Sequence, residues 1–124
     1  MKRVVVCLSA AAVLLTVYAP VGASADLATR AKPKCHGKIA TIVGTNGSDE
    51  IHGTAGRDII KAKRGSDDIE GKGGDDLICG NAGRDDLEGD RGNDHLYGGN
   101  GIDKAEGDRG RDLCRAEVEQ RCEK

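Results

Sequence analysis

The chain has 124 residues and a formal net charge of −2, and 32% of its residues are charged. It has no Trp or Phe and only 2% aromatic residues, so a conventional core of large side chains is excluded. Nearly balanced charge and scarce aromatic residues also argue against a nucleic-acid partner, because such partners require basic, aromatic-rich surfaces. The length suits a single domain.

Residues 1–25 have the pattern of a cleaved secretory signal peptide. A basic start is followed by an apolar run over residues 4–17, and residues 23–25 read A-S-A, the small-residue pattern of a cleavage site. The run is shorter than the roughly 20 residues that a membrane span needs, so we expect no membrane span after cleavage. These features predict a secreted, extracellular protein.

Four cysteines remain once the predicted signal peptide is removed: Cys35, Cys79, Cys114 and Cys122. An even number in a short secreted chain predicts two disulfides. Four cysteines allow three pairings, and only sequence proximity distinguishes them. It favours Cys114 with Cys122, which leaves Cys35 with Cys79.

Residues 26–43 precede the main body of the chain and are predicted to form a leader and a cap. Residues 26–34 are small and polar and include Pro33, which is typical of a flexible segment. Residues 35–43 match one repeat in length and place Ile42 where the later repeats have an apolar residue. We therefore expect this stretch to form an N-terminal capping strand.

Residues 44–115 consist of eight copies of a nine-residue repeat, and a fixed short period predicts a stacked solenoid. Position 4 of the repeat is Gly in all eight copies. Position 6 is always Asp: Asp49, Asp58, Asp67, Asp76, Asp85, Asp94, Asp103 and Asp112. Position 8 is apolar: Ile51, Ile60, Ile69, Ile78, Leu87, Leu96, Ala105 and Cys114.

Positions 1–6 of each repeat carry residues typical of a turn, and positions 7–9 are predicted to form a very short strand. The Gly residues of the turn permit positive φ and close backbone approach. The last three positions alternate outward, inward and outward, as a strand does. Successive strands must then run in opposite directions, so two repeats make one coil and two parallel sheets face each other across position 8. Ala62 replaces Gly at position 1 of the third repeat, and we expect that turn to be remodelled.

Stacking of alternate repeats aligns the position-6 carboxylates in two rows. One row holds Asp49, Asp67, Asp85 and Asp103, and the other holds Asp58, Asp76, Asp94 and Asp112. Adjacent strands lie about 4.8 Å apart, and carboxylates at that spacing repel one another unless a cation lies between them. Carboxylate and carbonyl oxygens suit Ca²⁺ better than a transition metal or Mg²⁺. Three gaps in each row predict up to about six Ca²⁺ ions, with the end sites incomplete.

These repeats resemble the RTX, or haemolysin-type, calcium-binding nonapeptide G-G-x-G-x-D-x-U-x, in which U is apolar. The resemblance covers residues 44–115. It implies an all-β fold, a parallel β-roll or right-handed solenoid of two sheets, with Ca²⁺ held by the position-6 Asp residues and backbone carbonyl groups. The whole chain is similar to the small secreted calcium-binding proteins of Gram-positive actinobacteria.

Two features depart from the pattern of that family. Position 2 is Gly only at Gly99 and elsewhere is occupied by Thr45, Thr54, Lys63, Lys72, Asn81, Asp90 and Asp108. Those turns are expected to bind Ca²⁺ more weakly, although Asn and Asp tolerate the left-handed region. Family members exported by the type I route carry an uncleaved C-terminal signal, whereas the signal predicted here is N-terminal.

The interior of the predicted roll is thin, so folding is expected to depend on the metal. Eight position-8 side chains, two of them small, cannot by themselves offset the conformational entropy lost on ordering the whole repeat array. We predict a chain that is largely disordered without Ca²⁺ and β-rich with it.

The outward positions differ between the two predicted sheets. Even-numbered repeats carry an apolar strip of Ile59, Leu77 and Tyr97, whereas odd-numbered repeats are charged at these positions. We hypothesise that residues 26–35 or a binding partner covers this strip; the alternative is scattered surface residues of no consequence.

The three His residues are expected to be solvated. Residues 116–124 are predicted to cap the last coil as one helical turn or a loop.

The repeats contain no nucleophile–base set, so we expect no enzymatic activity. The favoured function is a secreted calcium-ion-binding protein whose metal-folded rod is a structural or interaction module. The alternative is an accessory or folding module of a secreted enzyme or toxin system. The partners would be calcium ions and an unknown protein or cell-surface partner.

Overall fold

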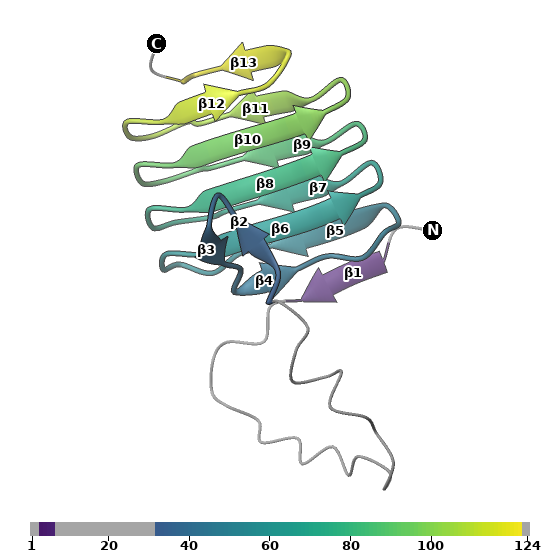
Figure 1. The fold of residues 1–124 in the computed structure, drawn as a ribbon. Helices are drawn as coiled ribbons and strands as arrows, with labels where there is room; N and C mark the ends of the chain where they lie inside the picture. Colours follow the sequence, from purple (N-terminus) through teal and green to yellow (C-terminus); the bar gives the residue numbers. More distant parts are fainter. Residues whose placement is uncertain (1–2, 7–31, 123–124) are drawn as a thin grey trace, which may run out of the picture.

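The computed structural model describes residues 3–6 and 32–122, and these form a roll of two parallel β-sheets (Figure 1). The first sheet holds, in spatial order, β1 (Arg3–Val6), β5 (Asp49–His52), β7 (Asp68–Glu70), β9 (Asp86–Glu88), β11 (Lys104–Glu106) and β13 (Val118–Gln120). The second holds β4 (Ile42–Val43), β6 (Ile59–Arg64), β8 (Leu77–Ala82), β10 (His95–Asn100) and β12 (Leu113–Arg115). Within these ranges no helix is long and apolar enough to cross a membrane.

Strand pairing follows the two-repeat period of the sequence. Ile60 pairs with Ile78 in the second sheet, and Ile69 pairs with Leu87 in the first, both in parallel register. Because successive strands alternate between the sheets, two repeats make one coil and the eight repeats make four coils. The predicted all-β, parallel two-sheet β-roll is therefore confirmed.

A single column of position-8 side chains fills the space between the sheets. Every position-8 residue is at most 6% exposed, and six of the eight are Ile or Leu with no exposed surface. Ile42 of β4 and Ala62 of β6 join the same apolar cluster. The core is thus as narrow as the repeat implies, with one position-8 side chain for each repeat and only Ala62 added to it from within the repeats.

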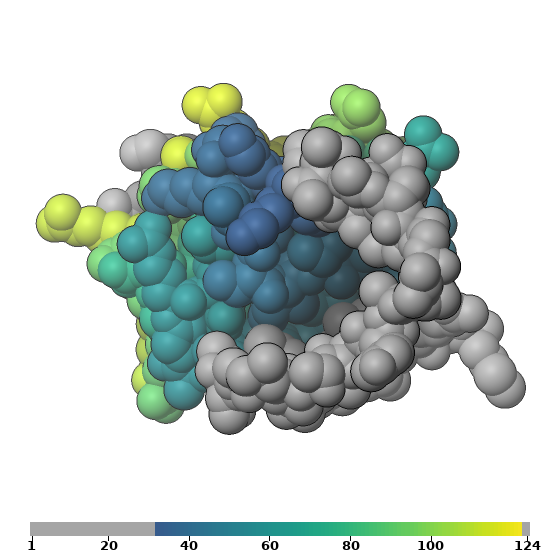
Figure 2. Space-filling view, turned by 60° about the horizontal axis from the view of Figure 1, so that its bottom comes forward, coloured from purple at the N-terminus to yellow at the C-terminus, as the bar shows by residue number. Residues whose placement is uncertain are grey.

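The segment before the repeats folds back over the outer face of the second sheet (Figure 1). It forms an antiparallel hairpin of β2 (Lys34–Cys35) and β3 (Lys38–Ile39), and Cys35 is bonded to Cys79 of β8. β2 contacts both β6 and β8, and Figure 2 shows the dark blue atoms of this segment lying against the roll. The predicted disulfide is present and fixes the hairpin in place.

The hairpin covers the apolar strip that the sequence places on this face. Cys35, Leu77 and Cys79 are buried together, with Ile59 and Tyr97 packed beside them. The ring of His36 stacks on Tyr97 at 3.7 Å between centroids. His36 is exposed, as expected, but its ring contacts Tyr97, and the strip is covered by residues 34–39. Residues 26–31 of the predicted leader lie outside the described residues.

The other two cysteines close the C-terminal end of the roll. The predicted disulfide between Cys114 and Cys122 is present. Between them, β13 pairs in parallel with β11, so that Ala105 lies opposite Glu119. The tail is thus a further strand of the first sheet and not the helical turn or loop that we expected.

At the N-terminal end, β1 pairs in parallel with β5 and puts Val5 opposite Ile51. β1 belongs to the predicted signal peptide, residues 1–25, the rest of which lies outside the described residues.

Candidate metal centre

The position-6 Asp residues form two rows, one along each edge of the roll, where the sequence places them. All eight are at most 5% exposed, although a charged carboxylate is rarely buried without a partner. Each row follows the turns of alternate repeats, so the strand register positions the carboxylates one coil apart.

One oxygen of each carboxylate beyond the first coil is held by the backbone of the previous coil. Oδ1 accepts a hydrogen bond from the N–H of the Asp one coil earlier, at 2.7–3.1 Å. The acceptors are Asp67, Asp76, Asp85, Asp94, Asp103 and Asp112. These bonds form a continuous side-chain-to-backbone ladder along each edge.

Glu117 extends the ladder of the odd-numbered repeats beyond the last Asp. Its Oε2 accepts a 2.7 Å hydrogen bond from the N–H of Asp103. The sequence did not reveal this role, because Glu117 lies beyond the last repeat and outside its register. The longer Glu side chain makes the contact from the capping segment.

The second carboxylate oxygen has no hydrogen-bond donor along most of the two rows. Within the described residues this holds for Oδ2 of Asp67, Asp76, Asp85, Asp94 and Asp103, all fully enclosed. A buried anionic oxygen without a donor carries a large desolvation cost. This is the kind of atom that a cation would stabilise.

Backbone carbonyl oxygens lie near two of these Oδ2 atoms, those of Asp76 and Asp85. A Cβ built on Gly71 would lie 2.7 Å from Oδ2 of Asp76 and 3.0 Å from the carbonyl oxygen of Gly89 in the next coil. Gly80 has the corresponding neighbours, Oδ2 of Asp85 and the carbonyl oxygen of Gly98. Glycine at position 1 thus leaves room for a carboxylate and a carbonyl to converge between coils.

Burial makes these carboxyl groups hard to ionise in the absence of a cation. It raises the pKa of Asp76 from 3.8 to about 7, with repulsion from Asp94 and Asp58 adding to the effect. Burial likewise raises the pKa of Asp85 and of Asp94 to about 6, and repulsion from neighbouring carboxylates adds to the effect. The backbone hydrogen bond to Oδ1 lowers the pKa in each case but does not outweigh burial.

The turns that carry these Asp residues share one backbone conformation. Positions 2 and 4 both have positive φ in all six turns of repeats 3–8, for example 74° at Lys72 and 109° at Gly74. A Cβ on Gly74 would lie within 2.6 Å of the backbone of residues 56–57 in the previous coil, so only Gly fits there. Ala62 does not change this pattern: Lys63 and Gly65 have φ of 96° and 129°, so the remodelling expected at Ala62 is not seen.

The turns of the first two repeats, residues 44–49 and 53–58, have a different conformation. None of their residues has a positive φ. Oδ2 of Asp49 accepts hydrogen bonds from the N–H of Thr45 at 2.6 Å and from its hydroxyl at 3.0 Å. Asp58 receives the same pair of bonds from Thr54, at 2.6 and 2.9 Å. Oδ2 of these two carboxylates therefore has protein donors, whereas Oδ2 of Asp67, Asp76, Asp85, Asp94 and Asp103 has none among the described residues.

The donor set along both edges fits Ca²⁺. It consists of carboxylate and backbone carbonyl oxygens on Gly-rich turns, and among the described residues neither a His nitrogen nor a free thiol lies in the two rows. Hard oxygen ligands in adaptable loops are what Ca²⁺ requires, whereas softer metals favour nitrogen and sulfur. The Asp carboxylates and the position-1 carbonyl groups are the residues that would hold the ion.

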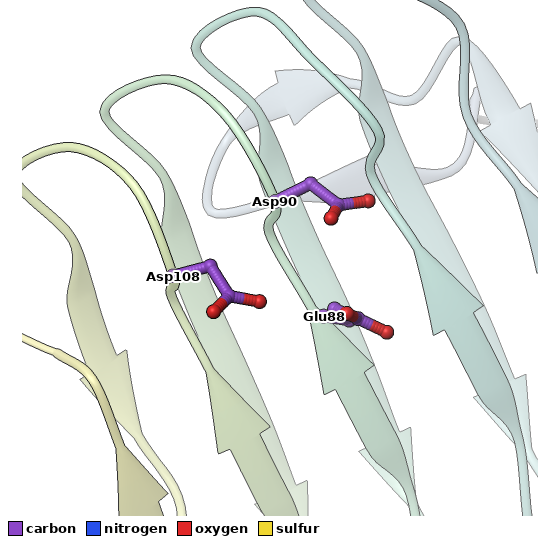
Figure 3. A group of neighbouring side chains, drawn as sticks. All are labelled: Glu88, Asp90 and Asp108. Carbon is purple, nitrogen blue, oxygen red and sulfur yellow. The ribbon is translucent and has the colours of Figure 1, made fainter.

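A second acidic group lies outside the two rows, at the ends of β9 and β11 (Figure 3). Glu88, Asp90 and Asp108 each bring one carboxylate oxygen within 4.8 Å of the other two. Burial raises the pKa of Glu88 and of Asp90, and their acidic neighbours raise both further. Arg121 donates a hydrogen bond to Asp108 and so supplies a positive charge to this group.

Charged pairs cover the remaining outer face of the first sheet. His52 lies 2.7 Å from Glu70 and 3.3 Å from Glu50, and Lys104 lies 3.3 Å from Asp86. His52 thus has one acidic partner on its own strand, β5, and one on the neighbouring strand, β7. These pairs are partly exposed and contribute little to stability.

Comparison with known families agrees with this geometry. The family model of the RTX calcium-binding nonapeptide repeat (4 copies) matches residues 43–78 and 80–114, which is more than half of the chain. No match was found among curated proteins or among solved structures. With its Asp-lined turns stacked in a parallel roll, the chain belongs to the RTX calcium-binding nonapeptide repeat family.

Proposed function

We propose that this chain is a secreted calcium-binding protein in which Ca²⁺ binds between stacked turns and stabilises the roll. The observation that carries the proposal is the buried Oδ2 atom that lacks a donor among the described residues, repeated from Asp67 to Asp103. At Gly71 and Gly80, a carbonyl oxygen of the next coil lies beside such an atom. The proposed ligands are the position-6 Asp residues, among them Asp76 and Asp85, with neighbouring carbonyl groups.

Calcium binding is proposed to be coupled to folding. Without a cation, the folded chain must either bury several uncompensated carboxylates or protonate them, and both reduce its stability at neutral pH. In the unfolded chain these carboxylates are hydrated and distant from one another. Ca²⁺ that binds only the folded form then stabilises it by mass action.

The proposed role of the metal-bound roll is structural or as an interaction module, and not enzymatic. Export is supported by the signal pattern of residues 1–25 and by the two disulfides, which are typical of oxidising compartments. An extracellular module commonly binds Ca²⁺ with a Kd of about 10⁻⁴–10⁻³ M, and we expect this range for most sites.

Isothermal titration calorimetry of the chain without residues 1–25 tests this proposal. Purified in EDTA and dialysed, the chain should bind several Ca²⁺ ions and respond much less to Mg²⁺, whose tighter octahedral geometry these turns do not match. Replacing Asp76, Asp85 and Asp94 together by Asn should remove binding at the corresponding gaps. Absence of Ca²⁺ binding at millimolar concentration would rule out the proposed function.

A further inference from the structure

Two turns of the roll differ in one residue and adopt different conformations. Residues 53–58 read G-T-A-G-R-D, and residues 80–85 read G-N-A-G-R-D. In the second turn Asn81 and Gly83 have φ of 82° and 137°, whereas in the first neither Thr54 nor Gly56 has a positive φ. The only sequence difference within these turns is Thr against Asn at position 2.

The same contrast recurs in a second pair of turns. Residues 44–49 read G-T-N-G-S-D, and residues 98–103 read G-G-N-G-I-D, so these turns differ at position 2 and at the outward position 5. Gly99 and Gly101 have φ of 104° and 138°, whereas neither Thr45 nor Gly47 has a positive φ. Both turns with Thr at position 2 thus lack positive φ at positions 2 and 4, whereas both comparison turns have it. We call the turns with positive φ at both positions the left-handed class.

The chemistry of position 2 explains the two classes. A β-branched residue such as Thr is strongly disfavoured at positive φ, whereas Gly adopts it freely and Asn tolerates it. Held out of the left-handed region, Thr54 directs its N–H and hydroxyl toward Asp58. The hydroxyl oxygen of Thr54 also accepts a 3.2 Å hydrogen bond from the N–H of Gly56, which links position 4 to the same hydrogen-bond network.

The consequence appears at the carboxylate. Oδ2 of Asp58 has two donors from Thr54, whereas Oδ2 of Asp85 in the matched turn has none among the described residues. Asp49 and Asp103 form the same contrast, with Thr45 as the donor to Asp49. The Thr N–H and hydroxyl thus occupy the carboxylate oxygen that would otherwise coordinate a cation.

We propose that Thr45 and Thr54 take the place of the metal in the first coil and confine Ca²⁺ to the later gaps. This inference rests on the proposed calcium function. Each edge then has three turns of the left-handed class, at residues 62–67, 80–85 and 98–103 on one edge and 71–76, 89–94 and 107–112 on the other. Three such turns leave two gaps on each edge, so four gaps are flanked on both sides by binding turns. The chain therefore binds four Ca²⁺ ions in these gaps, not six.

The test is the number of bound Ca²⁺ ions in variants that exchange the two classes. The double variant T45G/T54N gives residues 53–58 the sequence of residues 80–85 and puts Gly at position 2 of the first turn. It should raise the stoichiometry from four to six. The reciprocal variant N81T places Thr in a turn that flanks two gaps and should lower the stoichiometry from four to two.

The double variant T45V/T54V is the matched control, because Val is β-branched but has no hydroxyl. It should keep four ions while lowering the Tm in saturating Ca²⁺. Circular dichroism in Ca²⁺ establishes that each variant is folded. If T45G/T54N and N81T both bind as many ions as the parent chain, Thr does not set the class and the inference is wrong. If the parent chain binds no Ca²⁺ at all, the proposed function itself fails.

Discussion

The backbone N–H of Asp58 donates a 2.7 Å hydrogen bond to Oδ1 of Asp76, one coil further along the roll. The two oxygens of Asp76 therefore differ. Oδ1 ties successive coils together, while Oδ2 has no donor among the described residues and is a proposed Ca²⁺ ligand. Substitutions that separate these two roles should affect the metal-free and calcium-bound forms differently.

The substitution Asp85→Asn should separate the roles of the two carboxylate oxygens. The Asn oxygen can still accept the hydrogen bond from Asp67, but the buried negative charge is lost. We expect the affinity of the adjoining Ca²⁺ sites to fall at least about tenfold, equivalent to about 1.4 kcal/mol, while the metal-free chain becomes no less stable. Calorimetry in Ca²⁺ measures the first effect, and thermal melts in EDTA at pH 5, where protonation stabilises the metal-free fold, measure the second. Asp85→Ala, which also removes the acceptor, should lower the Tm at pH 5.

The stability of the metal-free chain should decrease as the pH rises. The folded-state pKa values of Asp76, at about 7, and of Asp85 and Asp94, at about 6, lie above the ordinary value of 3.8. The folded chain then binds more protons than the unfolded chain between about pH 4 and 7, so protonation stabilises it below that range and the effect is lost as pH rises through it. Circular dichroism and thermal melts in EDTA at pH 5 and pH 8 test this, with more β structure and a cooperative transition expected at pH 5 and little of either at pH 8.

Calcium binding should show the opposite pH dependence, because Ca²⁺ and protons compete for the same carboxylates. Lowering the pH from 8 to 5 should weaken binding progressively. Calorimetry in buffers of different ionisation enthalpy should show that protons are released when Ca²⁺ binds near pH 6. Binding that is independent of pH in this range would contradict the assignment of these buried carboxylates as ligands.

Alanine at position 4 should be far more costly in the later turns than in the first two. Gly83 has φ of 137°, and an added Cβ would collide with the carbonyl oxygen of Gly65. At Gly56 φ is not positive, and the nearest atom to an added Cβ is 3.9 Å away. We expect Gly83→Ala to cost more than about 2 kcal/mol, from backbone strain and the clash together, and Gly56→Ala less than about 1 kcal/mol. Urea denaturation in saturating Ca²⁺ measures both, and equal costs would contradict the two conformational classes.

The Cys35–Cys79 disulfide should stabilise the roll more than the Cys114–Cys122 disulfide. The bonds close loops with sequence separations of 44 and 8 residues, for which the chain-entropy relation gives about 4 and about 2.5 kcal/mol. Removal of the first bond also releases the hairpin that covers Leu77 and Tyr97. Double Cys→Ser variants of each pair, compared in Ca²⁺ by urea denaturation, test the order. Equal losses would contradict this order.

The sequence predicted the features that depend on the repeat period. Register, the buried position-8 column and the two rows of Asp all follow once two repeats make one coil, as the pairing of Ile60 with Ile78 illustrates. The two disulfides followed from the number of cysteines and their proximity. These features are local or periodic, and so they can be deduced without coordinates.

The features that the sequence did not predict depend on contacts outside the repeat. Glu117 reaches Asp103 only because the tail forms a strand beside β11, and His36 reaches Tyr97 only because a disulfide places the hairpin. The difference between Thr54 and Asn81 was visible as a departure from the consensus. Its meaning required the backbone angles and the hydrogen bonds to Asp58.

Far-ultraviolet circular dichroism during a titration from EDTA into Ca²⁺ tests the central claim most directly. The chain without residues 1–25, with both disulfides intact, should change from a largely disordered spectrum to a β-rich one as the Asp rows acquire cations at neutral pH. The midpoint should match the calcium affinity from calorimetry, and Mg²⁺ at the same concentration should have little effect. A β-rich spectrum in EDTA that Ca²⁺ leaves unchanged would contradict the account.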